Sequence, residues 1–270
     1  MEIGFTKAHG LGNDFVIIDE LFGAVKIPED KKPDFARQVC ERKHSVGADG
    51  VLVLSHSEDA DFMMRVFNSD GSEAETCMNG LRCSAFVYLK KRGKSRPIIE
   101  TRAGKVKARV RKLEQNLADV EIQVLGRRQY EDKGILRIGE RELAYHFIDV
   151  GNPHAVIFLD EPVEKFPVEK IGHQVEYCPK FQPNRVNTEF VNVIERDYLQ
   201  MRVHERGVCE TQACASGSVA STIAACELGY CDKDKWVTVK QPGGELKIKY
   251  GKELYLRGPA EISFYGKIQW

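Results

Sequence analysis

The chain repeats a pattern at a spacing of about half its length of 270 residues. Residues 65–68 are followed nine positions later by Cys77, and residues 202–205 are followed nine positions later by Cys214, so both matches are offset by 137 positions. Two further matches have nearly the same offset, between residues 12–13 and 151–152 and between residues 104–107 and 244–247. Four matches in the same order indicate two copies of one domain, each about half of the chain.

Short β-type segments outnumber helical ones in both halves, which predicts an α+β fold. Strands are predicted at residues 4–7, 15–19, 51–54, 62–67, 98–101, 106–110, 120–124, 144–150, 155–159, 189–194, 199–203, 237–240, 246–250 and 253–256. Helices are predicted at residues 33–42, 78–91 and 215–228. The last helix is rich in Ala and Ser and has no charged residue before Glu227, so we expect it to be enclosed on all sides. Each half is therefore predicted to be a sheet curled around its own buried helix.

The charge composition disfavours several classes of function. The 40 Lys and Arg residues balance the 40 Asp and Glu residues, whereas a general nucleic-acid-binding protein needs a basic excess. Because no apolar run approaches the roughly 18 residues of a membrane helix and no secretory signal is evident, we expect a cytoplasmic protein without nucleic-acid or membrane partners. The eight cysteines lack metal-ligand spacing, so no metal site is expected, and disulfides are not the default in the cytoplasm.

Cys77 and Cys214 occupy equivalent positions in the two copies, each at the start of a predicted helix. Backbone N–H groups and the positive end of the helix dipole stabilise negative charge there, which lowers the pKa of a thiol, and the same N–H groups can bind a carboxylate. If the copies pack about a pseudo-twofold axis, both helix starts face one ligand. A thiolate on one side and a thiol on the other is what inversion at a carbon atom requires. The alternative is two buried cysteines without chemistry.

Ten short motifs run in one order through the whole chain. They are KAHGLGNDF at 7–15, GADG at 47–50, FNSDGSEAE at 67–75, CMNGLRC at 77–83, GNPH at 151–154, NRVN at 184–187, ERG at 205–207, ETQAC at 210–214, PGG at 242–244 and GPA at 258–260. With these motifs the sequence resembles the diaminopimelate epimerase family, whose members are cofactor-independent amino-acid epimerases of lysine and cell-wall biosynthesis. Any one motif alone would be weak, but the series is highly specific.

The resemblance implies two homologous mixed α/β domains, each a β-barrel-like sheet around a central helix, related by a pseudo-twofold axis. It implies an N-terminal domain at residues 1–116, to which residues 262–270 return, and a C-terminal domain at residues 117–261. The implied reaction converts LL-diaminopimelate to meso-diaminopimelate with a cysteine base and a cysteine acid. Neither pyridoxal phosphate nor another cofactor is expected, and the implied assembly is a homodimer.

The resemblance also implies roles for the site residues. Cys77 and Cys214 match the base and acid pair, and His154 and Glu205 match residues that tune the cysteine pKa values. The residues that match substrate-binding positions are Asn13, Asn68, Met78, Asn79, Asn152, Asn187, Glu205, Arg206, Ala215 and Ser216. Arg206 and most of the asparagines match contacts to the distal end of the substrate, whereas Met78, Asn79, Ala215 and Ser216 match backbone donors to the reacting carboxylate. Three of the asparagines also lie in sequences typical of turns, which leaves a purely structural role open for them.

The sequence departs from the family pattern at several positions that usually hold glycine. These are Met78 and Ala215, directly after the two cysteines, and Ser45 and Cys209; in addition, His204 replaces a usual aromatic residue. Met78 must point away from a bound carboxylate or narrow the site. Two alternatives therefore stay open: a racemase of another amino acid on the same fold, and an inert binding protein, against which the presence of both cysteines speaks.

Overall fold

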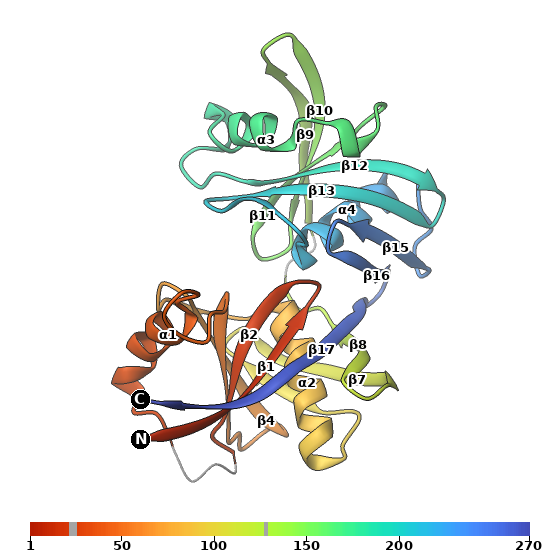
Figure 1. Cartoon of the computed structure of the whole chain (residues 1–270). Coiled ribbons are helices and arrows are strands. Elements are labelled where there is room, and N and C mark those ends of the chain that lie inside the picture. Colours follow the sequence, from red (N-terminus) through yellow and green to blue (C-terminus); the bar gives the residue numbers. More distant parts are fainter. Residues whose placement is uncertain (22–25, 127–128) are drawn as a thin grey trace. The chain divides into compact units, whose positions relative to one another are not determined.

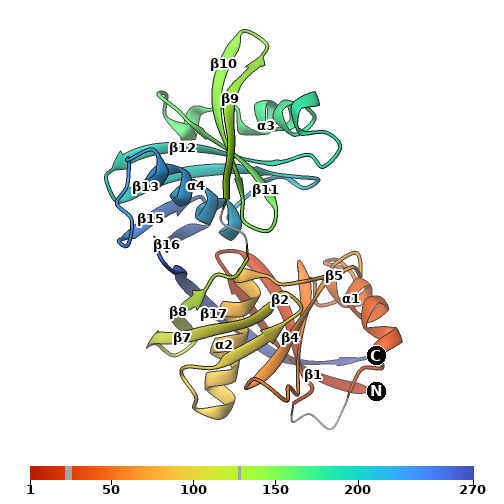
Figure 2. The ribbon, with the colours of Figure 1, turned by 180° about the vertical axis from the view of Figure 1, so that it is seen from behind.

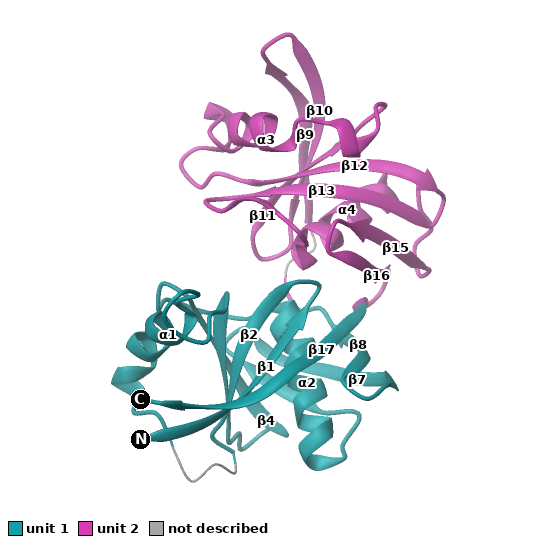
Figure 3. Cartoon of the chain, in the orientation of Figure 1, with its two compact units in different colours: residues 1–125, 257–270 teal, residues 126–256 magenta. Residues whose placement is uncertain are grey.

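The computed structural model describes residues 1–21, 26–126 and 129–270, which form two compact units. Unit 1 consists of residues 1–125 and 257–270, and unit 2 of residues 126–256 (Figure 3). The sequence placed the division after residue 116 and the return at residue 262. In the structure, residues 117–125 lie in unit 1 because the strand at Leu117–Gln123 pairs with the strand at Gly104–Leu113. The return begins earlier because one strand, Leu254–Gln269, runs out of unit 2 and into unit 1.

Eight strands of unit 1, all within the described residues, pair in a closed ring. The order is β1–β2–β3–β4–β6–β7–β8–β17 and back to β1, with parallel pairs at β2–β3 and β4–β6 and the short strand β5 against β4. These strands are β1 (Glu2–Gly10), β2 (Asn13–Asp19), β3 (Gly50–Ser55), β4 (Phe62–Asn68), β5 (Glu73–Ala74), β6 (Ile98–Thr101), β7 (Gly104–Leu113), β8 (Leu117–Gln123) and β17 (Leu254–Gln269). Because the ring is closed, the sheet has no unpaired edge along it.

The helix α2 (Met78–Arg92) lies inside this ring and contacts β1, β2, β3, β4, β7 and β8 (Figures 1 and 2). Its residues from Asn79 to Val87 are all buried, and it ends at Gly93, whose positive φ of 72° closes the helix in the left-handed conformation. The helix α1 (Lys32–Cys40) packs against β3 and β4 through Phe35, Ala36 and Val39. Strand β3 therefore has a helix on both faces, which explains its continuous run of buried apolar residues.

Unit 2 repeats this arrangement. Its strands are β9 (Gln129–Ile138), β10 (Arg141–Asp149), β11 (Pro153–Phe158), β12 (Asn187–Glu195), β13 (Tyr198–Glu205), β14 (Cys209–Thr211), β15 (Trp236–Gln241) and β16 (Gly244–Tyr250). The enclosed helix is α4 (Ala215–Glu227), and α3 (Val168–Glu176) packs on β12 and β13 as α1 packs on β3 and β4. Three 3-10 turns complete the described elements: η1 (Glu29–Lys31), η2 (Val163–Lys165) and η3 (Pro179–Phe181).

The strand registers confirm the duplication predicted from the sequence. In the parallel pair β2–β3, Phe15 lies opposite Gly50, and in the equivalent pair β11–β12, His154 lies opposite Asn187. In the next pairs, Leu52 faces Val66 in unit 1 and Glu189 faces Val203 in unit 2, so the offset of 137 positions recurs in the structure. The sequence predicted a sheet curled around its own helix in each half. Unit 1 has this arrangement as a closed barrel, and in unit 2 the equivalent strands pair in the equivalent order.

Apart from the short strands β5 and β14, which were not predicted, three longer elements differ from the sequence prediction. Helix α3 was not predicted, although Val168, Ile171 and Val175 form a buried stripe along it. Strand β9 was not predicted because most of its side chains are exposed or half-buried and give no apolar alternation. Strand β17 is far longer than the predicted segment at residues 253–256. No helix within the described residues has the length and hydropathy needed to span a lipid bilayer.

Candidate active site

The two equivalent cysteines each cap the start of an enclosed helix, as the sequence predicted. Cys77 is the N-cap of α2 with φ −146° and ψ 119°, and its sulfur accepts a hydrogen bond from the backbone N–H of Gly80 at 3.4 Å. Cys214 is the N-cap of α4 with φ −120° and ψ 112°, and its sulfur accepts from the N–H of Gly217 at 3.4 Å. Both sulfurs therefore lie where the helix dipole stabilises negative charge.

In unit 1, two predicted binding residues gather at the sulfur of Cys77. The Oδ1 atom of Asn13 is 3.9 Å from the Cys77 sulfur and accepts a hydrogen bond from Asn79 Nδ2 at 3.0 Å. Asn13 Nδ2 donates in turn to Asp49 Oδ2 at 2.9 Å, so the Asn13 amide is held at both ends. Met78 is half-buried at the first position of α2, where backbone N–H groups have no acceptor within the helix.

Asn68 lies at the exposed end of β4 rather than among these residues. Its Nδ2 atom donates to Ser72 Oγ at 2.9 Å, and its backbone N–H donates to the carbonyl of Ser72 at 2.8 Å. Asn68 therefore stabilises the turn between β4 and β5, which is the structural role that its sequence context had left open.

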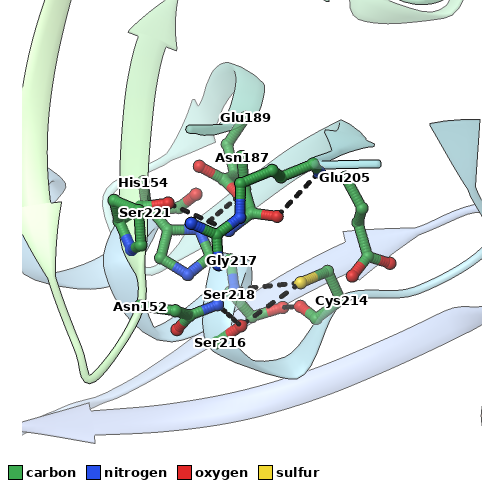
Figure 4. A network of polar contacts seen from close by, with 12 residues as sticks. Asn152, His154, Asn187, Glu189, Glu205, Cys214, Ser216, Gly217, Ser218 and Ser221 are labelled. Atoms are coloured by element: carbon green, nitrogen blue, oxygen red, sulfur yellow. Dashed lines mark hydrogen bonds and ion pairs between the residues drawn. The ribbon is translucent and has the colours of Figure 1, made fainter. Parts of the chain in front are cut away.

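In unit 2, Cys214 is buried and surrounded by polar groups (Figure 4). Its sulfur lies 3.4 Å from Ser216 Oγ, and Asn152 Nδ2 donates to the same oxygen at 3.4 Å. The backbone N–H of Cys214 donates to Gln241 Oε1 at 2.7 Å, which fixes the start of the helix to β15. Asn152, Ala215 and Ser216 thus lie together beside the cysteine.

Two carboxyl groups face the sulfur of Cys214. Burial, followed by the charges of Glu205 and Glu189, raises the pKa of the Cys214 thiol well above its ordinary range. Burial also raises the pKa of the Glu205 carboxyl, although hydrogen bonds from Thr211 and Cys214 act in the opposite direction. Cys214 is therefore a protonated thiol at neutral pH in this structure, and a protonated thiol can act as a proton donor.

The second of these carboxyl groups forms a buried pair with His154. Glu189 Oε1 lies 2.7 Å from His154 Nδ1, and both side chains are completely buried. His154 was identified from the sequence, but Glu189 was not. The signal available was a charged residue inside the apolar segment at residues 189–194, at the position that Leu52 occupies in the other copy.

Asn187 and Arg206 form a second cluster at the end of β13. Asn187 Oδ1 accepts from the backbone N–H of Arg206 at 3.0 Å, and Asn187 Nδ2 donates to the carbonyl of Pro153 at 2.9 Å. Arg206 itself is exposed and donates through Nη1 to the carbonyl of Asn184 at 2.7 Å. This bond holds the guanidinium group while other N–H donors stay available for a carboxylate.

His204, which replaces an aromatic residue of the family pattern, anchors the turn that carries Arg206. Its Nε2 atom lies 2.9 Å from Glu176 Oε2, and both side chains are buried. Glu176 Oε1 accepts from the backbone N–H of Gly207 at 3.0 Å and from Arg185 Nη1 at 2.9 Å. Cys209, another departure, adopts a left-handed φ of 83°, which explains why glycine is usual there.

Among the described residues, no group of three or more His, Cys, Asp or Glu side chains is arranged to hold a metal ion. The groups found in the two copies are two cysteines that cap helices, two clusters of amide side chains, two carboxyl groups near Cys214, and Arg206 held by a hydrogen bond. These groups can transfer protons and bind carboxylates.

The structure resembles solved structures of amino-acid isomerases and related proteins. A hydroxyproline epimerase from Agrobacterium vitis superposes with a TM-score of 0.72 and 12% identity, covering 99% of this chain and 92% of that one. A phenazine biosynthesis protein from Bacillus anthracis gives a TM-score of 0.72 and 15% identity over the whole of both chains. The chain therefore has the fold that is shared by this epimerase and this phenazine biosynthesis protein.

Sequence comparison defines the family within that fold. The diaminopimelate epimerase family model matches residues 5–125 and 146–262. The diaminopimelate epimerase of Carboxydothermus hydrogenoformans is 39% identical over 279 residues, covering 97% of this chain and 98% of its own. That of Teredinibacter turnerae is 38% identical over 284 residues and covers both chains completely. The chain belongs to the diaminopimelate epimerase family.

Proposed function

We propose that this protein interconverts LL-diaminopimelate and meso-diaminopimelate by moving one proton at one α-carbon. One cysteine thiolate removes the α-proton, and the other cysteine, as a thiol, delivers a proton to the opposite face of the same carbon. The reaction leaves the first cysteine protonated and the second as a thiolate, so the reverse reaction uses them in exchanged roles. The observation that carries this proposal is the equivalent capping position of Cys77 and Cys214 in the two copies.

The environment of Cys214 supports its role as the proton donor. Burial and the carboxyl groups of Glu205 and Glu189 disfavour the thiolate there, so Cys214 holds a proton until negative charge develops on the substrate carbon. The helix dipole at its sulfur then compensates part of the charge that the departing proton leaves behind. His154 and Glu205 tune the pKa of the cysteines in this proposal.

Backbone and amide groups bind the substrate. The N–H groups at the starts of α2 and α4, from Met78, Asn79, Ala215 and Ser216, bind the reacting carboxylate, and Glu205 faces the reacting amino group. Arg206 binds the distal carboxylate, with Asn13, Asn68, Asn152 and Asn187 as further contacts to the distal end. No pyridoxal phosphate or other cofactor takes part, because the two cysteines and the helix starts supply the proton transfers and the charge stabilisation.

We also propose that the protein acts in the cytoplasm, as a homodimer, in the formation of precursors of lysine and peptidoglycan. The proposed compartment rests on the family match over both halves of the chain. The assembly and the pathway rest on the family to which the chain belongs.

The test is substitution of each cysteine with chiral analysis of the product. Cys77→Ala and Cys214→Ala should each abolish epimerisation, because every turnover needs both a base and an opposing acid. Each single variant should still exchange the α-proton of one stereoisomer with deuterium from the solvent through the remaining thiolate. Cys178→Ala is the matched control, because Cys178 is half-buried at the end of α3 and outside both clusters.

Near-normal turnover by either cysteine variant would refute the two-cysteine mechanism. Assays with lysine and alanine test the alternative of a racemase for another amino acid. Activity on these substrates equal to that on diaminopimelate would refute the proposed binding of a distal carboxylate by Arg206.

A further inference from the structure

A buried carboxylate lies at the end of helix α3 in unit 2. Glu176 is the last residue of this helix, and its two carboxyl oxygens contact different parts of the fold. Its Oε2 atom lies 2.9 Å from His204 Nε2 on β13. Its Oε1 atom accepts from the backbone N–H of Gly207 at 3.0 Å and from Arg185 Nη1 at 2.9 Å. Both oxygens therefore have partners, and Arg185 supplies a compensating positive charge.

The close approach of α3 to β13 brings this carboxylate to its partners. Gly172 lies on α3 against His204, and a Cβ atom at Gly172 would clash with the Cβ atom of that side chain. The glycine lets the helix lie directly on the strand, so the carboxyl group of Glu176 reaches both the imidazole ring and the turn that follows β13.

The equivalent place in unit 1 is apolar, so the fold itself does not require a charged group there. Helix α1 also has nine residues, and its last residue is Cys40. Phe67 stands on β4 where His204 stands on β13, at the offset of 137 positions. Cys40 and Phe67 both belong to the hydrophobic core of unit 1. Because an apolar cluster is often at least as stable as a buried ion pair, the pair in unit 2 calls for a functional reason.

The first segment that Glu176 holds is the turn after β13, in which Arg206 lies. The backbone N–H of Arg206 donates to Asn187 Oδ1 at 3.0 Å, and the next N–H, of Gly207, donates to Glu176. Two successive N–H groups of the turn thus have side-chain acceptors. These two bonds fix the backbone from which the side chain of Arg206 extends.

The second segment is the loop before β12, which holds the guanidinium group of Arg206. Arg206 Nη1 donates to the carbonyl of Asn184 at 2.7 Å. The next residue, Arg185, has a left-handed φ of 56°, and its N–H donates to the carbonyl of Phe181 at 2.7 Å. Such a conformation is unfavourable for a residue other than glycine and needs support from its surroundings. The ion pair between Arg185 and Glu176 supports it, and so stabilises the loop that presents the Asn184 carbonyl.

We propose that Glu176 is a positioning residue that determines specificity for a distal carboxylate by holding Arg206. One buried carboxylate connects the turn that carries the backbone of Arg206 with the loop that holds its guanidinium group. The remaining N–H donors of that group are therefore oriented before substrate binds, so less conformational entropy is lost on binding. This inference rests on the proposed function, in which Arg206 binds the distal carboxylate of diaminopimelate.

The test is a double-mutant cycle between Glu176 and Arg206, with KM and kcat measured for diaminopimelate. Arg206→Met alone should raise KM about tenfold or more, because it removes a charged hydrogen-bonding group. Glu176→Gln keeps the size of the side chain and removes its charge. It should raise KM about three- to tenfold and change kcat less than about twofold, because it weakens a contact remote from the reacting carbon. In the Arg206→Met background, Glu176→Gln should raise KM no further, since Glu176 acts through Arg206.

Variants of Arg185 break the same connection from its other end, so they test the inference even if Glu176→Gln does not fold. Arg185 is partly exposed, and Arg185→Met removes its ion pair with Glu176. We expect this variant to raise KM as Glu176→Gln does, and Arg185→Lys, which keeps the charge, to retain most of the wild-type KM. Glu169→Gln is the matched control, because Glu169 lies on the same helix and is exposed. Its KM should equal that of the wild-type protein.

The inference is overturned if Arg206→Met raises KM but Glu176→Gln and Arg185→Met leave it unchanged. Equal increases in the wild-type and Arg206→Met backgrounds would also overturn it, because Glu176 would then act on the fold and not through Arg206. A loss confined to kcat would do the same. The proposed function fails on a different result: an unchanged KM in Arg206→Met would refute the binding of a distal carboxylate, and the inference would fall with it.

Discussion

At the scale of single residues, the carboxyl group of Glu205 helps to keep the Cys214 thiol protonated. Its negative charge raises the pKa of the neighbouring thiol, after burial itself. Glu205→Gln removes that charge and keeps an oxygen that can accept from Thr211 and Cys214. We therefore expect the pKa of Cys214 to fall and its alkylation at neutral pH to become faster.

The measurement is alkylation by iodoacetamide over a range of pH, with the modified Cys214 peptide quantified by mass spectrometry. Glu210→Gln is the matched control, because Glu210 lies on β14 close in sequence to Cys214 but pairs with Arg202 at 2.7 Å. If the alkylation of Cys214 is accelerated equally in Glu210→Gln and in Glu205→Gln, then the structure of the local strand, and not the charge of Glu205, determines the reactivity of Cys214.

Asp14 gives unit 1 a pH-dependent part of its stability. Burial raises its pKa, but hydrogen bonds and charges from Arg42 and Lys7 outweigh this and lower it from 3.8 to about 2. A carboxyl group whose pKa is lowered by folding stabilises the folded state above its unfolded pKa, and this stabilisation is lost as the pH falls through the folded pKa.

Asp14→Asn should therefore reduce the free energy of unfolding by about 1–2 kcal/mol at neutral pH, allowing for solvent around the exposed Arg42. The difference from the wild-type protein should narrow as the pH falls from 3.8 toward about 2. Urea unfolding at several pH values measures this difference. A difference that is independent of pH would show that Asp14 acts through packing or geometry and not through its charge.

At the scale of elements, the third residue of each enclosed helix is a glycine for a different reason. A Cβ atom at Gly217 would lie 2.6 Å from Glu189 Oε1, and one at Gly80 would lie 3.0 Å from Leu52 Cδ2. Glu189 is fixed by its buried pair with His154, whereas a leucine methyl group can shift by a few tenths of an ångström. Alanine is also preferred over glycine in helices by about 0.8–1 kcal/mol.

We expect Gly217→Ala to lower turnover at least about tenfold, because displacement of the start of α4 moves Cys214 and misplaced reacting groups can cost about 100-fold. Gly80→Ala should be close to the wild-type protein in thermal stability and lose much less turnover. Parallel measurement of turnover and thermal unfolding for both variants tests this pair. Equal losses would contradict the distinction between a fixed carboxyl group and a mobile methyl group.

The sequence was sufficient for the enclosed helices but not for α3. The repeat and the polar cysteine at each helix start located α2 and α4 to within one residue of their ends. In α3, Gly172 interrupts the helical pattern and is present because a Cβ atom there would lie 2.3 Å from the Cβ atom of His204. That contact comes from β13, so no local signal in the sequence of α3 could reveal it.

The local sequence was likewise sufficient for only part of the candidate site. Cys77, Cys214, Asn13 and Asn152 lie in motifs whose turn and cap chemistry can be recognised locally. Glu176 and Glu189 depend instead on being enclosed, and burial is a tertiary property that the helix or strand sequence does not contain. For Glu189 the repeat was nevertheless a usable signal, because this residue breaks the symmetry of otherwise matching segments.

At the scale of the whole molecule, the same fold occurs twice, and the two copies bury different ionisable side chains. Each copy has an enclosed helix capped by cysteine, and the strands around the two helices keep the same register. The buried ionisable groups differ: Arg82 in unit 1 and the His154–Glu189 pair in unit 2. In the proposed mechanism one cysteine removes a proton and the other delivers one, so unlike buried charges in the two copies suit two different roles.

The connection between the copies also affects stability, because β17 completes the barrel of unit 1 from the far end of the chain. It pairs with β1 from Glu2 opposite Gln269 to His9 opposite Glu261. Phe264 packs edge-on against Phe5 with ring centroids 6.0 Å apart, and Trp270 packs edge-on against Phe35 at 5.3 Å. These two aromatic pairs alone contribute about 1–3 kcal/mol.

Removal of residues 264–270 should therefore open the barrel along β1 without affecting unit 2. The β1 amides that donate to β17 lose their acceptors, so their hydrogen exchange should accelerate, whereas β1 amides that donate to β2 keep partial protection. Strand β10 provides the internal control, because it is the counterpart of β1 and pairs with β9 and β11 within unit 2. Unchanged protection of β1 would show that the barrel is stable without its last strand. Equal loss of protection in β1 and β10 would show that the two units unfold as one.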